Sequence, residues 1–182
     1  SDGAALGHRG MPFGAVRNLA GNNSWTNAGT GVGLGAVDLR TTNDTNDRNF
    51  WIGSDAGALN IVGQIAGTNN NGTVRQGHTV NTTGAGTIRY SGAESNLITG
   101  ATTILHGALE LNKNAGTNAI AGTVVVGDGS GAGVNVATLR WVQNNQIGNT
   151  TVTFSPSGRV DMGAQTDLVG TIDLQRTRNL AT

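Results

Sequence analysis

Two carboxylates, Asp161 and Asp173, occupy matching positions in two similar segments, 158–162 (GRVDM) and 170–174 (GTIDL). If these segments form neighbouring strands, the carboxyl groups lie about 5–10 Å apart, a separation that suits glycoside hydrolysis. A simpler interpretation places both side chains in solvent on the outward face of a strand. The 11 acidic residues of the chain are spread along its length, whereas a polysaccharide-cleaving site needs clustered carboxylates. The sequence therefore favours the simpler interpretation.

Two polar loops have a composition that is seen in ion-binding loops. The first, 127–133 (GDGSGAG), lacks the Lys-Ser/Thr pair of a phosphate loop and the tandem copies of calcium-binding nonapeptides. The second, 41–48 (TTNDTNDR), offers Asp44 and Asp47 as oxygen ligands for a hard cation. Asp and Asn side chains also bond to their own backbone in ordinary turns. Ordinary turns are favoured for both loops, and we expect no metal ligand in either.

The histidines, His8, His78 and His106, are far apart in the sequence and show no metal-ligand spacing. None of them has a Ser, Asp or Glu nearby in a pattern typical of nucleophilic catalysis. The chain has no Cys, which excludes thiolate chemistry. The sequence therefore predicts no catalytic, cofactor-binding or metal-binding residue, and we expect a protein that is not an enzyme.

The elements that position these residues are predicted to be strands. Gly, Thr and Asn supply 30, 24 and 21 of the 182 residues, and all three weaken helices. No stretch of about ten residues has the 3.6-residue apolar period of a helix, whereas short runs of β-branched residues recur between turn residues. These features predict an all-β fold with no significant helix.

One strand pattern recurs five times: a turn Gly, then an inward apolar residue, an outward polar residue and a second inward apolar residue. The copies are 57–61 (GALNI), 86–90 (GTIRY), 107–111 (GALEL), 158–162 (GRVDM) and 170–174 (GTIDL). Recurrence of one strand pattern is typical of a β-solenoid, in which each coil buries its inward residues against its neighbours. An antiparallel sandwich needs hairpin loops, and only Asn71-Gly72 and Asp128-Gly129 qualify. We expect one β-helical domain over 1–182, with roughly eight coils.

The segments 83–92 (TGAGTIRYSG) and 98–111 (ITGATTILHGALEL) together resemble the autotransporter-associated β-strand repeat. Flanking phrases extend the resemblance over 14–174, leaving a less regular segment at 1–13 and a tail at 175–182. The resemblance implies a right-handed parallel β-helix in large secreted or surface proteins of Gram-negative bacteria. It brings no known catalytic residues, so none is carried over.

We expect a non-enzymatic structural protein, located outside the cell or on a bacterial cell surface. Its partners are expected to be copies of itself or adjacent repeats of its parent chain, stacked end to end, because neither terminus offers an evident cap. Zero net charge argues against nucleic acid as a partner, and no apolar run is long enough for membrane insertion.

Two alternatives remain open at this point: an adhesin passenger that binds surface glycans, and a β-helical carbohydrate-active enzyme. Outward aromatic residues would favour the first alternative, and a cleft with several acids the second. Four aromatic residues could stack on sugars: Trp25, Trp51, Tyr90 and Trp141. Trp51 and Trp141 lie in strand-like segments, so we expect them to fill the core.

Overall fold

Short strands make up the regular structure of the computed structural model, which describes residues 6–7, 11–12, 16–26, 37–38, 49–67, 79–129 and 136–175. Within these residues there are 17 strands and no helix. Many of the strands are rich in Val, Ile and Thr, whose branched side chains favour extended backbone. The expected all-β fold without significant helix is confirmed for the described part of the chain.

Two parallel sheets contain most of these strands. The seven-stranded sheet consists of β3 (Val16–Asn18), β6 (Asn49–Ser54), β9 (Thr79–Thr83), β11 (Thr102–Ile104), β13 (Val124–Val126), β15 (Thr151–Phe154) and β17 (Thr171–Leu174). The six-stranded sheet consists of β4 (Asn22–Thr26), β7 (Ala58–Val62), β10 (Thr87–Gly92), β12 (Gly107–Lys113), β14 (Ala137–Trp141) and β16 (Gly158–Asp161). The short strands β5 (Val37–Asp38) and β8 (Ile65–Ala66) form a parallel pair, and β1 (Leu6–Gly7) and β2 (Met11–Pro12) an antiparallel pair.

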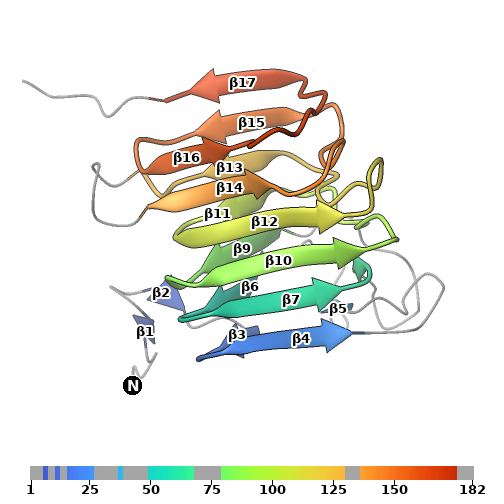
Figure 1. Ribbon diagram of the computed structural model, residues 1–182. Coiled ribbons are helices and arrows are strands. Elements are labelled where there is room, and N and C mark those ends of the chain that lie inside the picture. Colours follow the sequence, from blue (N-terminus) through green and yellow to red (C-terminus); the bar gives the residue numbers. More distant parts are fainter. Residues whose placement is uncertain are drawn as a thin grey trace, which may run out of the picture.

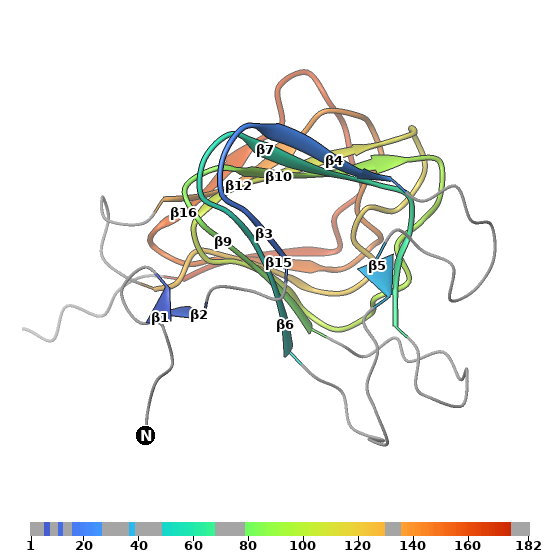
Figure 2. The same ribbon diagram turned by 90° about the horizontal axis from the view of Figure 1, so that it is seen from below.

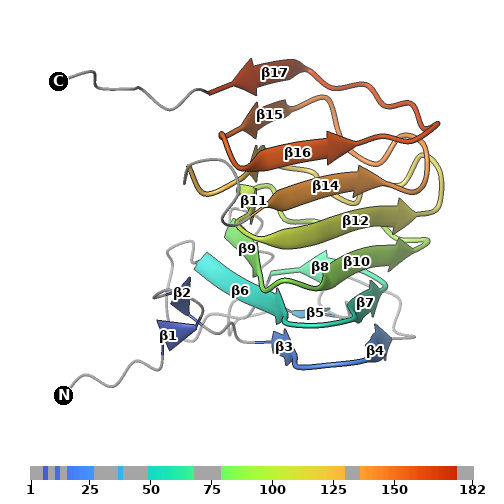
Figure 3. The ribbon, with the colours of Figure 1, turned by 60° about the vertical axis from the view of Figure 1, so that its left-hand side comes forward.

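The chain alternates between the two large sheets, so that each sheet grows by one strand at a time in sequence order (Figure 1). All neighbouring strands in these sheets are parallel. Figure 2 shows the two sheets facing each other around a common interior, and Figure 3 shows their strands in successive layers. Parallel strands need long crossover connections, and here the crossovers pass through the opposite sheet. This arrangement is consistent with the predicted β-helix or β-solenoid.

The recurring strand pattern sets the register of the six-stranded sheet. Four of its five copies lie in β7, β10, β12 and β16, and their first inward residues fall in one row. That row is Leu59, Ile88, Leu109, Leu139 and Val160, where Leu139 belongs to β14. Within the row, Leu109 and Leu139 are fully buried. The fifth copy forms β17 in the other sheet.

The length of a coil varies because its loops vary. Arg89 and Glu110 face each other on adjacent strands and are 21 residues apart, whereas Glu110 and Arg140, also on adjacent strands, are 30 residues apart. The sheets accept this variation because the extra residues lie outside the paired strands, where loops tolerate insertions. The strands therefore stay in register along the axis, although the number of residues per coil differs.

A tight corner at Gly84 connects β9 to β10. Gly84 has φ +89°, in the left-handed region that favours glycine, and a Cβ there would lie 2.2 Å from the carbonyl oxygen of Ser54. Gly86 N donates a 2.7 Å hydrogen bond to the same oxygen. The corner of one coil therefore rests directly on the backbone of the coil before it, and this contact leaves no space for a side chain.

Candidate functional site

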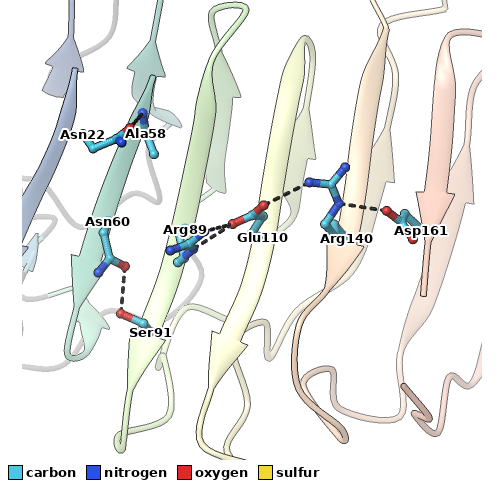
Figure 4. Close-up of polar contacts among 8 residues, drawn as sticks. All are labelled: Asn22, Ala58, Asn60, Arg89, Ser91, Glu110, Arg140 and Asp161. Atoms are coloured by element: carbon cyan, nitrogen blue, oxygen red, sulfur yellow. Dashed lines mark hydrogen bonds and ion pairs between the residues drawn. The ribbon is translucent and has the colours of Figure 1, made fainter. Parts of the chain in front are cut away.

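A row of charged side chains crosses the outward face of the six-stranded sheet (Figure 4). Arg89 Nε donates to Glu110 Oε2 at 2.7 Å, and Arg140 Nη1 donates to Glu110 Oε1 at 3.1 Å. Arg140 Nε donates to Asp161 Oδ2 at 2.8 Å. These residues come from β10, β12, β14 and β16, where strand pairing places them in register. We call Arg89, Glu110, Arg140 and Asp161 the charge ladder.

The charges in this ladder alternate in sign from coil to coil, which is the favourable order for directly opposed cross-strand pairs. Hydrogen bonds to Asp161 and Glu110 raise the pKa of Arg140. Glu110 is outward, as strand alternation predicts, but it is only 7% exposed because an arginine covers it from each side. The recurring strand pattern predicts the outward position of Glu110 but not its burial, because the neighbours that cover it belong to adjacent coils, far away in the sequence.

The pair of carboxylates that suggested glycoside hydrolysis is not brought together. Asp161 lies on β16 of the six-stranded sheet, whereas Asp173 lies on β17 of the seven-stranded sheet. Asp161 is bound by Arg140, and Asp173 is exposed with a long contact of 3.4 Å from Gln175 Nε2. The two similar segments occupy different sheets, so the suggested alignment across coils is wrong.

Two of the other sequence candidates, Asp128 and His106, lie within the described residues. Asp128 Oδ1 accepts a 2.9 Å hydrogen bond from the Ser157 hydroxyl, which ties the start of the glycine-rich loop to the next coil's turn. His106 is half-buried at the corner between β11 and β12. The acid-rich loop, His8 and His78 lie outside the described residues. Among the residues that the structure describes, no three His, Asp or Glu side chains gather to hold a metal ion.

The aromatic residues do not form an outward platform in the described region. Trp141 is 4% exposed and Tyr90 is 2% exposed, and both belong to the core. The prediction that Trp141 fills the core is confirmed, while Trp51 is only half-buried. Trp25, on β4, is 43% exposed. Of Trp25, Trp51, Tyr90 and Trp141, it is the only side chain that is exposed.

Exposed apolar side chains are concentrated in residues 158–174, which include the edge strands β16 and β17. Four side chains there are exposed: Val160, Leu168, Ile172 and Leu174, at 51%, 71%, 62% and 72%. Val160 and Ile172 continue the inward rows of Leu139 and Val152, which are 0% and 1% exposed one coil earlier. Val160 and Ile172 thus occupy core positions that no described coil covers. We call these four residues the open edge.

The opposite edge combines two exposed apolar side chains, Leu19 and Trp25, with a network of asparagines. Asn18 Nδ2 donates to Ser54 Oγ and to the backbone oxygens of Gly21 and Ala56, each at 3.1 Å. Asn23 Nδ2 donates to Asn18 Oδ1 at 2.6 Å. Asn23 of β4 therefore occupies the position in the row that Leu59 and Leu109 occupy in later coils.

Lys113 is the residue whose environment the sequence did not reveal. It is the only lysine of the chain and is fully buried at the end of β12. Its Nζ donates to Gly63 O at 2.7 Å and to Ser91 O at 3.2 Å, so one side chain links three successive coils. Burial lowers the pKa of Lys113 to about 8, an effect partly opposed by the charge of Glu94. The presence of a single lysine in the chain is only a weak signal that this lysine is buried. Its hydrogen-bond partners are 50 and 22 residues away, so the sequence did not indicate them.

The pKa of Lys113 predicts a specific dependence of stability on pH. The folded pKa of about 8 lies below the ordinary value of 10.5, so from pH 8 upwards the unfolded chain binds more protons, and stability rises with pH. The rise should approach 2–3 kcal/mol by about pH 10. Burial raises the pKa of Tyr90 above its ordinary value, so above about pH 10 stability falls again.

Urea unfolding between pH 7 and pH 10.5 measures this dependence. The matched variant is Lys113→Met, which keeps an unbranched side chain of similar length and removes the titrating amine. Its stability should be nearly independent of pH between 8 and 10. An equal slope in the variant and the parent chain would show that other groups cause the rise.

Asp167 holds the turn that follows β14. Its Oδ2 accepts hydrogen bonds from Trp141 Nε1 at 2.7 Å, from Gln146 N at 2.7 Å and from Ile147 N at 2.8 Å. Gln146, itself fully buried, receives a 2.8 Å bond from Lys113 N on its Oε1. A carboxylate that accepts several N–H bonds fixes the backbone around it, so Asp167 couples the last coils of the described solenoid.

Replacing Asp167 by Ala should lower the free energy of unfolding by about 2 kcal/mol, because four N–H donors, including Leu168 N, lose a charged acceptor. The fluorescence emission of Trp141 should shift as its indole N–H loses this partner. Asp173→Ala is the matched control, since that carboxylate is exposed and makes only the long contact with Gln175. The control should change stability by less than about 0.5 kcal/mol. Equal effects of the two substitutions would contradict the assigned role.

No described helix is long and apolar enough to cross a membrane. Comparisons of the chain with protein-family models, with curated proteins and with solved structures find no match.

Proposed function

We propose that this chain is a non-enzymatic segment of a stiff β-helical rod, located outside the cell or on a bacterial cell surface, whose column continues beyond β17. The proposal includes a right-handed coil, which about 98% of parallel crossovers adopt, and retains the prediction of roughly eight coils. The single observation that carries it is the open edge, where Val160 and Ile172 extend rows that are fully buried one coil earlier.

The open edge supports continuation because a coil exposes its inward face only where stacking stops. Solenoids that end in solvent cover the last coil with a polar or amphipathic cap. Here Ile172 and Leu174 are 62% and 72% exposed, and the edge strands β16 and β17 each have one unpaired side. Unpaired parallel strands with apolar faces are templates for a further strand.

The charge ladder defines the coil that fits this edge. Arg89, Glu110, Arg140 and Asp161 alternate in sign along the axis, and Asp161 is its last member. A following coil that continues the pattern carries Arg or Lys beside Asp161 and an apolar residue beside Val160. The rod that we propose therefore extends through a coil with a basic outward residue.

Adding a coil tests this proposal. Residues 155–174, which form one coil ending in β17, are inserted a second time between Leu174 and Gln175, with Arg at the inserted position equivalent to Asp161. We expect slower amide exchange in β16 and β17 and a higher melting temperature than in the parent chain. The matched control keeps Asp at that inserted position and should be less stable. Unchanged exchange in β16 and β17 for both chains would refute continuation at this edge.

A second candidate is head-to-tail stacking of identical copies into a fibre. The observation that favours it is the position of β3 and β4 at the opposite edges of the same two sheets, running parallel to β17 and β16. Stacking in register would place Val16 of the next copy against Leu174 and Ser24 against Asp161. Such a contact is heterologous and propagates without closing.

Electron microscopy and sedimentation distinguish this candidate. If copies stack, concentrated protein forms filaments, and Ile172→Glu at the inward position abolishes them. Thr171→Glu, the exposed outward neighbour on the same strand, is the control and should leave filaments intact. Discrete particles at high concentration would refute stacking of copies, while the added-coil experiment would still test continuation itself.

A further inference from the structure

A small cavity lies in the interior, between the two sheets. Tyr90 of β10 and Thr102 of β11 line it together with Asn96, and apolar side chains that include Ile65, Ile98 and Ile120 complete the wall. The volume of the cavity is about 10 Å³, which is close to the space that one water molecule needs. The cavity therefore reaches the lower limit of the space that holds one water molecule.

Tyr90 contributes a buried hydroxyl group to the residues that line this cavity. Tyr90 is 2% exposed, and its oxygen has no hydrogen-bond partner among the described residues. Buried hydroxyl groups in folded proteins are almost always paired with protein or with ordered water. Burial raises the pKa of Tyr90, so the hydroxyl keeps its proton and can act as a donor.

The other polar groups around the cavity provide further partners. Asn96 is 4% exposed and is fixed by two hydrogen bonds: Oδ1 accepts from Ile65 N at 2.8 Å, and Nδ2 donates to Ala119 O at 2.7 Å. A carboxamide can make four hydrogen bonds, so one acceptor site and one amide hydrogen remain. Thr102, 4% exposed, adds a hydroxyl that both donates and accepts.

We propose that this cavity is a binding site for a single structural water molecule. The Tyr90 hydroxyl donates to the water oxygen, and the water donates in turn to the Thr102 hydroxyl and the Asn96 carboxamide. Two to four polar partners are what a buried water requires. The water connects β10 of one sheet to β11 of the other, so it fixes the two sheets relative to each other at this level of the rod.

A double-mutant cycle with Tyr90→Phe and Thr102→Val tests the bridge, since either substitution removes one anchor of the water. We expect each single variant to be destabilised and the pair to be non-additive by about tenfold in the unfolding equilibrium constant. Thr103→Val, the next residue on β11 and directed outward, is the control and should be additive with Tyr90→Phe. Additivity of Tyr90→Phe and Thr102→Val would overturn the proposal.

A direct measurement on the unmodified chain accompanies the cycle. Magnetisation transfer from water to the Tyr90 ring, or a crystal structure with a density peak beside its hydroxyl, should show the bound water. A dry cavity would give neither signal, and Tyr90→Phe would then be more stable than the parent chain. Either result would overturn the proposal even if the variants in the cycle failed to fold.

Discussion

Replacing Leu109 by Asp is expected to unfold the chain or to leave it barely folded. Leu109 is fully buried in β12, between Ile88 of β10 and Leu139 of β14 in the same inward row. A carboxylate at this position has no cationic partner in the row, and burying it costs several kcal/mol or forces it to bind a proton. The free energy of unfolding of a whole domain is about 5–15 kcal/mol. The stability lost through this one substitution is therefore a large part of the total. Circular dichroism and urea unfolding measure it.

Glu110→Gln is the matched comparison, because Glu110 is the next residue on the same strand but faces outward. It should cost about 1–2 kcal/mol, since Arg89 and Arg140 lose their shared carboxylate while keeping an amide oxygen as acceptor. This loss is larger than that of an ordinary surface change, because the two arginines cover Glu110. Equal stability losses for Leu109→Asp and Glu110→Gln would refute the inward and outward assignment.

The alternation of inward and outward residues could be predicted from the sequence because it is local. A Gly followed by apolar, polar and apolar residues specifies both the corner and the two faces of a strand. The copies in β7, β10 and β12 pair in register, with Leu59, Ile88 and Leu109 in one row. The local pattern was therefore sufficient to predict the stacked strands of a β-solenoid.

Assignment of a strand to one sheet or the other could not be predicted in the same way. It depends on how many residues each loop takes up, and paired residues on adjacent strands of the two large sheets are between 20 and 36 residues apart. Asp161 and Asp173 occur in similar segments, yet the 12-residue interval between them leads to the opposite sheet rather than to the next coil. The hypothesis of a carboxylate pair failed for this reason.

Polar contacts between coils were also beyond sequence reasoning. Lys113 Nζ bonds Gly63 O, 50 residues earlier, and the charge ladder joins Arg140 to Glu110, 30 residues earlier. Neither distance corresponds to a fixed period, because loop lengths differ. Burial of a lone lysine and of the Tyr90 hydroxyl follows from the stacking of several coils, which only the folded chain defines.

Replacing Gly84 by Ala is the second change from which we expect a large effect. Its φ of +89° costs an L-residue about 1–2 kcal/mol, and the added methyl would lie 2.2 Å from Ser54 O, well inside contact distance. The oxygen belongs to the backbone of the preceding coil and also accepts the Gly86 N–H, so it cannot move without opening the stack. The expected loss exceeds about 3 kcal/mol, measured by urea unfolding.

Gly116→Ala separates the contact from the backbone strain. Gly116 has a similar φ of +81°, but a Cβ there meets nothing within 4 Å. Only the strain of the left-handed conformation remains, about 1–2 kcal/mol, and the reduced freedom of the unfolded chain offsets part of it. Gly84→Ala should therefore be more destabilising by about 2 kcal/mol or more. Similar losses in the two variants would mean that the corner at Gly84 can relax, and that the contact between coils there does not determine their spacing.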